Sequence, residues 1–225
     1  MIRTPRTLPV LTAAVGVAAA ALATTAFTSS AGAAAPRPPK PADRVTIGVA
    51  TVNGSGCRPG SASVAVAPDN SAFTVTYSEY LAQTGGAARP TDTRKDCRLS
   101  LHMNIPKGYT YAVGQADYRG YAHLAQGATA VQKAGYSFQG MSGASSRSHA
   151  FRGSLDDNWQ VTDSTDATAV MWAPCGQKRN FTIDTELSVD PGTSDPATTS
   201  YIAMDATDGS VNTLYHLSWK ECPTP

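Results

Sequence analysis

The sequence predicts an all-β protein, folded as a single antiparallel β-sandwich domain with two disulfides. Three observations support this prediction: apolar residues alternate with polar ones, turn-forming residues separate the alternating runs, and there are four cysteines. Apolar residues at every second position line one face of a strand, and one apolar face per strand is typical of antiparallel sheets. Short strands between such turns favour a two-layer sandwich, with a barrel as the alternative.

The alternation is clearest before the turn at Pro106. The apolar positions of that run are Cys97, Leu99, Leu101, Met103 and Ile105. The same pattern occurs at residues 45–49, 73–77, 181–189 and 215–219. No window longer than about ten residues carries the apolar stripe of an amphipathic helix.

A long hairpin is expected around Gln126-Gly127, a plausible two-residue turn between residues 109–125 and 128–139. This pairing sets Tyr121 opposite Gln132. One polar, solvated face of the hairpin would then carry Asp117, Arg119, Tyr121, His123, Gln132 and Tyr136. We take Asp117, Arg119 and Tyr121 from this face as candidate ligand-binding residues. A register slip of one residue would change the assignment.

The N-terminus has the three parts of a secretory signal peptide. Arg3 and Arg6 precede an apolar stretch at residues 10–23, and small residues follow at 31–35. The apolar stretch is shorter than the roughly 20 residues that a transmembrane helix needs. We therefore predict a secreted, extracellular protein with a signal peptide at residues 1–35, a flexible proline-rich leader at 36–43 and one domain at 44–225.

The mature chain is close to neutral. Removing Arg3 and Arg6 from the 18 basic residues leaves 16 against 17 acidic ones, a net charge of −1. Nucleic acids and anionic lipids are bound through clustered positive charge. We therefore expect no nucleic-acid partner and no membrane attachment after signal cleavage, and we expect a monomer.

The four cysteines are expected to form disulfides, because the predicted destination is oxidising. No pair has the C-x₂₋₄-C spacing of a zinc site. Four cysteines allow three pairings. Our hypothesis is Cys57–Cys97 and Cys175–Cys222, since each bridge then lies within one half of the chain. Cys97 occupies the same alternate positions of its strand as the apolar residues, so its sulfur should point into the core.

The segment at residues 145–159 concentrates charged and aromatic side chains without strong apolar periodicity. Its candidate ligand-binding residues are Arg147, His149, Arg152, Asp156, Asp157 and Trp159. They could converge on a ligand from one loop. The alternative, which we favour, is a solvated connection whose arginines and aspartates pair with each other while Trp159 anchors it to the core. Asp156 and Asp157 make a poor glycosidase pair, because neighbours in a strand point to opposite faces.

No catalytic, metal-binding or cofactor-binding motif is present. The chain lacks H-E-x-x-H, G-x-S-x-G and a P-loop. Asp163–Asp166 and Asp205–Ser210 offer oxygens of the kind that calcium takes, but neither has EF-hand spacing. We interpret Asp208-Gly209 as a hairpin turn between strands near Tyr201 and Tyr215. We expect no metal and no cofactor.

Several runs resemble the secreted domain of unknown function 4360 family, exported by actinobacteria and some fungi. They are VTIGVATVNGSGC from Val45, AVAPDNSAFTVTYSEYLA, TRKDCRLSLHMNIPKGYTYAV, DYRGYAHL and VNTLYHLSWKEC. The resemblance extends from Val45 to Cys222 and includes the four cysteines. It implies a secreted, cysteine-bridged β protein. It implies no particular reaction, so it assigns no catalytic residue.

Together these observations favour a non-catalytic extracellular protein that binds a glycan or a protein surface. A secreted hydrolase, using His149 or the Asp156/Asp157 region, is one alternative. A secreted inhibitor or structural protein is the other.

Overall fold

The computed structural model describes residues 40–143, 145–166, 168–204 and 213–223. The signal peptide and the start of the leader lie outside these residues. The strands are β1 (Thr46–Asn53), β2 (Ala62–Val66), β3 (Ala72–Tyr77), β4 (Leu81–Thr84), β5 (Arg94–Asn104), β6 (Tyr109–Leu124), β7 (Thr129–Phe138), β8 (Ser145–Arg152), β9 (Leu155–Ser164), β10 (Phe181–Asp190), β11 (Ser200–Ala203) and β12 (Thr213–Glu221). A single 3₁₀ turn, η1 (Pro90–Asp92), is the helical element of the described part.

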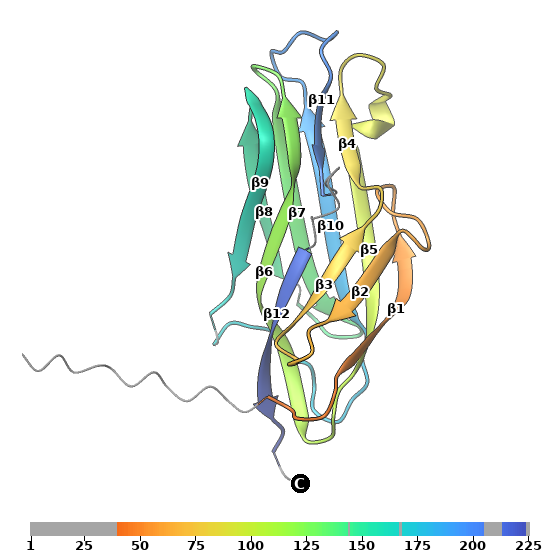
Figure 1. Cartoon of the computed structure of the whole chain (residues 1–225), viewed down its shortest axis with the longest axis vertical. Coiled ribbons are helices and arrows are strands. Elements are labelled where there is room, and N and C mark those ends of the chain that lie inside the picture. Colours follow the sequence, from red (N-terminus) through yellow and green to blue (C-terminus); the bar gives the residue numbers. More distant parts are fainter. Residues whose placement is uncertain (1–39, 144, 167, 205–212, 224–225) are drawn as a thin grey trace, which may run out of the picture. The chain divides into compact units, whose positions relative to one another are not determined.

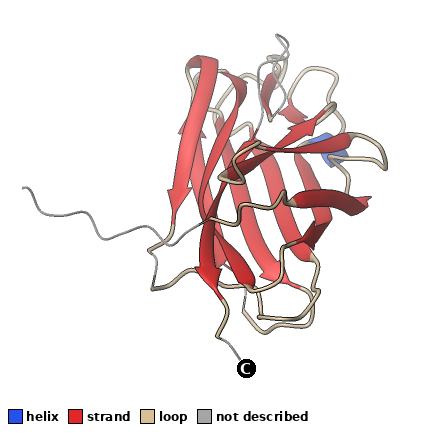
Figure 2. Cartoon of the chain, turned by 60° about the horizontal axis from the view of Figure 1, so that its bottom comes forward, coloured by secondary structure: helices blue, strands red, loops and turns tan. Residues whose placement is uncertain are grey.

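The strands form two antiparallel sheets that face each other, as Figures 1 and 2 show. The smaller sheet has the order β1-β5-β10-β7-β8. The larger sheet has the order β2-β3-β12-β6-β11-β4, and β9 pairs with β6 as well. The predicted all-β sandwich is confirmed. In Figure 1, β8 and β9 lie at one side of the sandwich, and β1, β2 and β4 lie at the other.

The predicted hairpin between residues 109–125 and 128–139 is wrong. β6 pairs with β12, β11 and β9 in the larger sheet, whereas β7 pairs with β10 and β8 in the smaller one. The chain therefore crosses from one sheet to the other at Gln126-Gly127. Gln132, 0% exposed, and Tyr136 share the inward face of β7 with the buried Phe138, and they are not on a solvated face with Tyr121.

The predicted hairpin near the C-terminus is also wrong. β11 pairs with residues 121–123 of β6, and β12 pairs with residues 109–117 of the same strand, both antiparallel. β11 and β12 therefore follow one another in the same direction along one edge of β6. The Asp208-Gly209 turn itself lies outside the described residues.

The core follows the alternation that the sequence predicts. Leu99 and Leu101 of β5 lie opposite Ile183 and Phe181 of β10 on the interior surface of the smaller sheet, and all four are buried. The larger sheet contributes mainly aromatic rings. Tyr215 stacks on Phe73 with ring centroids 4.9 Å apart, and Tyr118 meets Tyr215 edge to face.

Both predicted disulfides are present, Cys57–Cys97 and Cys175–Cys222. Cys57 and Cys97 are 3% and 2% exposed, so this bridge lies in the core, as the parity of Cys97 predicts.

Asn70 ties the start of the domain to its last strand. Its side-chain oxygen accepts from the Val45 amide at 3.1 Å, and its side-chain amide donates to the carbonyls of Pro41 and Asp43 at 3.1 and 2.9 Å. The Asn70 carbonyl accepts from the Trp219 indole at 2.8 Å. Residues 41–43, at the end of the proline-rich leader, are thus held against the domain.

We predict that Asn70→Ala lowers the free energy of unfolding by about 3–4 kcal/mol. The substitution removes two buried hydrogen bonds and one partly buried one, worth about 1 kcal/mol each, and leaves alanine at a φ of 57°. Asn70→Gly loses the same bonds without the backbone penalty, so it should be about 1 kcal/mol less destabilised. Urea unfolding of the three proteins measures both differences; equal losses in the two variants would contradict the backbone argument.

Candidate functional site

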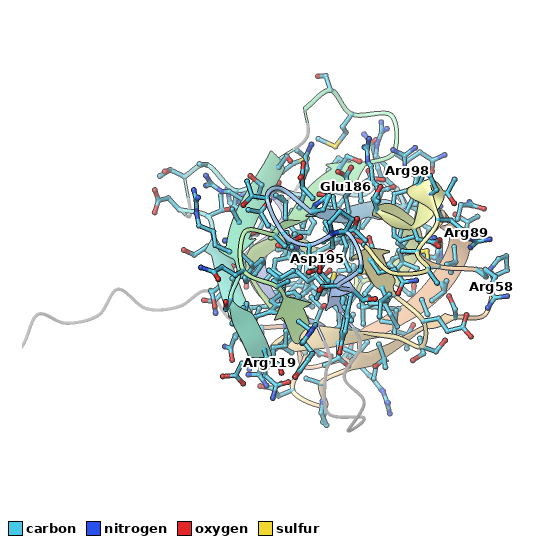
Figure 3. The ribbon with its side chains drawn as sticks, turned by 90° about the horizontal axis from the view of Figure 1, so that it is seen from above. Arg58, Arg89, Arg98, Arg119, Glu186 and Asp195 are labelled. Atoms are coloured by element: carbon cyan, nitrogen blue, oxygen red, sulfur yellow. A yellow bond between two sulfur atoms is a disulfide. The ribbon has the colours of Figure 1, made fainter. Side chains whose placement is uncertain are left out.

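A groove lies between β4 and the loop after β1, and we call it the Arg58 groove. Its volume is about 920 Å³. It is lined by Ser55, Gly56, Cys57, Arg58, Ser78, Glu79, Tyr80, Leu81, Arg89, Lys95, Tyr121, Tyr201 and Ala203. Figure 3 shows Arg58 and Arg89 close together at one side of the sandwich.

The Cys57–Cys97 bridge and Gly56 position the first wall of the groove. The bridge ties the loop to β5, and the Gly56 amide donates to the Asp96 carbonyl at 2.8 Å. A β-carbon at position 56 would lie 2.3 Å from the Tyr80 ring, so only glycine fits against that ring. The Tyr80 hydroxyl donates to the Lys95 carbonyl at 3.4 Å, and burial raises the pKa of Tyr80. The wall is therefore built on buried, well-defined contacts.

Three cations and one carboxylate line the groove. Arg58 pairs with Glu79 across the rim. Arg89 and Lys95 both bind Asp92, which lies beneath the groove and is 7% exposed. The Arg89 and Lys95 hydrogen bonds hold the pKa of Asp92 well below its usual range. The lining is therefore net positive.

Asp92 orients the Arg89 guanidinium and uses only some of the N–H donors of that group. Its two carboxylate oxygens accept from Nε and from one terminal nitrogen of Arg89, each at 3.1 Å. A guanidinium carries five N–H donors, so three remain for a ligand. The Arg89 side chain is 75% exposed and that of Arg58 is 76% exposed. Both can therefore reach a group that enters the groove.

Tyr121 and Tyr201 also line the groove. Their rings lie 6.2 Å apart at 26°, and Tyr201 also stacks on His123 at 5.6 Å. Asp156 holds this cluster, because it accepts from the Tyr121 hydroxyl at 2.5 Å and bonds His123 Nδ1 at 3.0 Å. The hydrogen bond to Asp156, together with partial burial, raises the pKa of Tyr121 to about 12. Tyr121 is therefore a neutral hydroxyl at physiological pH.

A second polar cluster surrounds Asp117 on the same outer face. The Thr162 hydroxyl donates to Asp117 at 2.6 Å, His216 Nε2 lies 2.8 Å from it, and the Gln115 amide contacts both of its oxygens at 3.2 Å. Burial acts to raise the pKa of Asp117, but these hydrogen bonds outweigh it and leave the pKa lowered. Arg119 lies between the two clusters along β6 and is exposed, and its side chain forms no ion pair with another described residue. Figure 3 places it on the opposite side of the molecule from Arg98 and Glu186.

Residues 145–159 are two strands at the far side of the sandwich, so the prediction of a loop or connection is wrong. Arg147 and Arg152 lie on β8, exposed, and pair with no aspartate of the described chain. Within the part of the chain that the structure describes, the Asp157 side chain accepts a hydrogen bond from the neighbouring Asn158 amide alone, at 2.7 Å. Asp156 and Asp157 point to opposite faces of β9, as strand geometry predicts. The expected pairing of arginines with aspartates in this segment does not occur.

Trp159 and His149 face the interior at this side. Trp159 is 6% exposed and packs on Phe151 with centroids 5.1 Å apart, so it anchors β9 to the core as predicted. His149 Nε2 lies 2.8 Å from Asp163, which is 8% exposed. His149 therefore pairs with Asp163 and not with Asp157.

Sequence reasoning missed most of the groove. Of the predicted site residues only Tyr121 lines it, and Asp156 supports Tyr121 from outside the lining. Arg58, Arg89 and Tyr201 lie in separate turns and strands, and no local pattern distinguishes them from other surface residues. Only the Cys57–Cys97 bridge, which was predicted, indicates where one wall lies.

In the ranges that the structure describes, no three or more histidine, cysteine, aspartate or glutamate residues gather in a way that could hold a metal ion. In the same ranges, no helix is long and apolar enough to cross a membrane. The Asp205–Ser210 segment lies outside them.

We predict that Asp117→Asn removes a pH-dependent part of the stability. Because the pKa of Asp117 is lowered in the folded protein, its contribution is complete above the unfolded pKa, about 3.9, and is lost as the pH falls through the lower, folded pKa. The wild-type protein should exceed the variant by about 1–2 kcal/mol at pH 7, and the gap should shrink below pH 4. Urea unfolding between pH 2 and pH 7 tests this. Asp157→Asn is the matched control, and a gap that stays constant with pH would contradict the prediction.

Comparison with known proteins places the chain in a family. Residues 43–222 match the family model described as "Domain of unknown function (DUF4360)". A protein of Arthroderma benhamiae, named "Uncharacterized secreted protein", is 30% identical over 180 residues, which cover 80% of this chain and 73% of that protein. The range matched by the family model includes all the strands, both disulfides and every residue that lines the Arg58 groove. The chain therefore belongs to the DUF4360 family.

Proposed function

We propose that the protein is exported and acts outside the cell as a non-catalytic binding protein, which takes an acidic glycan in the Arg58 groove. The observation that carries this proposal is the composition of the groove: exposed arginines and a pair of stacked tyrosines share its lining. The volume, about 920 Å³, lies within the usual range of ligand pockets, roughly 300–1,000 Å³.

Export is supported by two independent observations. The first 35 residues have the pattern of a signal peptide, and the Arthroderma benhamiae relative is named as a secreted protein. The two disulfides fit the same destination, since disulfides persist in oxidising compartments.

The chemistry of the groove fits a carboxylate-bearing saccharide. Arginine presents paired N–H donors that match a carboxylate, and three donors of Arg89 remain after Asp92 is bound. Tyrosine offers a rigid apolar face together with a polar hydroxyl. Tyr121 and Tyr201 can therefore contact the apolar face of a sugar ring while Arg58 and Arg89 bind its acidic group.

A secreted hydrolase is the second candidate, and the His149–Asp163 pair is the observation that favours it. A buried aspartate that orients a partly exposed histidine supplies two of the three members of a nucleophilic triad. No hydroxyl within the described chain is bonded to His149, so any nucleophile there would have to be water. We expect His149→Ala to leave ligand binding in the Arg58 groove unchanged.

We predict that the mature chain binds tetragalacturonate and binds its fully methyl-esterified form at least tenfold more weakly. The two ligands share one backbone and differ in charge. Arg58→Gln/Arg89→Gln should weaken tetragalacturonate binding at least tenfold, and Tyr201→Ala should weaken both ligands, because it removes the stacking surface. Binding should also weaken at 0.5 M salt, since exposed charges are screened. Isothermal titration calorimetry gives the affinities.

The matched control is Arg147→Gln/Arg152→Gln, which removes two positive charges at the opposite side of the sandwich. If this variant lost binding and the groove variant kept it, the site would lie at β8 instead. Equal binding of the charged and esterified ligands would remove the proposed role of the arginines. If neither ligand bound, and an acidic-glycan array were also empty, the glycan proposal would be wrong.

A further inference from the structure

We infer that the protein has a second binding site, for a small organic anion with an apolar body, in a pocket between the turn after β5 and residues 173–179. We call it the Lys107 pocket. Its volume is about 430 Å³. Its lining comes from two segments, residues 103–111 and residues 173, 174 and 176–179. Figure 1 shows the turn between β5 and β6 at the same end of the sheets as the C-terminal end of β12. The pocket shares no lining residue with the Arg58 groove, so this inference does not depend on the proposed function.

Covalent and hydrogen-bonded links hold the two segments together. The Cys175–Cys222 bridge ties residues 173–179 to the end of β12, and the Cys222 amide donates to the Gly108 carbonyl at 2.8 Å. The Ala173 amide donates to the Tyr111 carbonyl at 2.9 Å, and the Thr110 hydroxyl donates to the Ala173 carbonyl at 2.5 Å. The pocket is therefore built before any ligand arrives, which reduces the entropy lost on binding.

The lining carries positive charge that nothing in it neutralises. Lys107, Lys178 and Arg179 line the pocket, and neither segment contains an aspartate or a glutamate. Arg179 is held by neutral acceptors, since its Nε donates to Gln177 Oε1 at 2.9 Å and a terminal nitrogen donates to the Gln139 carbonyl at 2.6 Å. These bonds orient the guanidinium and leave its charge in place.

The two lysines are free of ion pairs with other described residues. An acidic residue, Glu221 of β12, lies opposite Tyr109 in the pairing of β12 with β6. It does not line the pocket. Three cations in one concave site favour an anion over a neutral or cationic ligand.

The rest of the lining is apolar or aromatic and indicates the body of the ligand. It includes Met103, Ile105, Pro106, Tyr109, Tyr111 and Pro174. Met103 and Tyr111 are 6% and 3% exposed, so they belong to the core as well as to the pocket. Such a wall with a few convergent charges is the usual composition of a small-molecule site. The pocket therefore suits a carboxylate or sulfonate attached to a ring or a short chain.

Binding of 1-anilinonaphthalene-8-sulfonate to the mature chain tests the inference. The uncharged N-phenyl-1-naphthylamine has the same ring system without the sulfonate, so it is the matched probe. We expect the sulfonate to bind at least tenfold more tightly than the neutral probe. Lys107→Gln/Lys178→Gln should weaken sulfonate binding at least tenfold, should leave the neutral probe unchanged, and should preserve the fold, because both side chains are exposed.

Two control variants locate the site. Arg44→Gln/Lys133→Gln removes two exposed positive charges elsewhere, and Arg58→Gln/Arg89→Gln removes two from the Arg58 groove. Both should bind the sulfonate as the wild-type protein does. If all three double variants lost affinity equally, net charge alone would explain the binding and the inference would fail. It would also fail if only the groove variant lost affinity, or if the neutral probe bound as tightly as the sulfonate.

Discussion

The buried bridge between Cys57 and Cys97 is the constraint on which the Arg58 groove depends. It joins the loop after β1 to the central part of β5, residues that are 40 positions apart in the chain. Without it, that loop would be held mainly by the Gly56 amide and by the Ser55 hydroxyl, which donates to Asp96 at 2.6 Å. The bridge turns a glycine-rich surface loop into a fixed wall, and it places Arg58 at the rim.

The opposite wall results from an interruption in the larger sheet. β11 and β12 occupy the same edge of β6 one after the other, and β4 pairs with β11. This arrangement brings Tyr201 beside Tyr121 and His123, so that three rings gather on the outer face of the sheet. The two strands that share this edge of β6 thus bring Tyr201 of β11 into the lining of the groove.

Charge is distributed unevenly over a molecule that is almost neutral as a whole. The outer face of the smaller sheet carries opposite charges on neighbouring strands, with Arg94 bound to Glu186 and Arg98 bound to Asp184, so they offset each other. The Arg58 groove and the Lys107 pocket instead keep a surplus of cations. The near-neutral net charge predicts no partner that needs a large basic surface, but it says nothing about a local site. The ligands that we propose for the two sites are small or narrow anions, which such local surpluses suit.

The sequence by itself determined which residues of each strand face the core, because side chains alternate with a period of two whatever the strand pairs with. It left three pairings of the cysteines open, and the one that we preferred is the one that the structure has. Asp117, Arg119 and Tyr121 do share one face, as parity requires. The alternation of side chains does not identify the neighbouring strand. We therefore predicted a hairpin of β6 and β7, although the two strands lie in different sheets. Only the tertiary structure decided that Arg58, Arg89 and Tyr201 meet, because sheet order and a disulfide bring together segments that no local pattern connects.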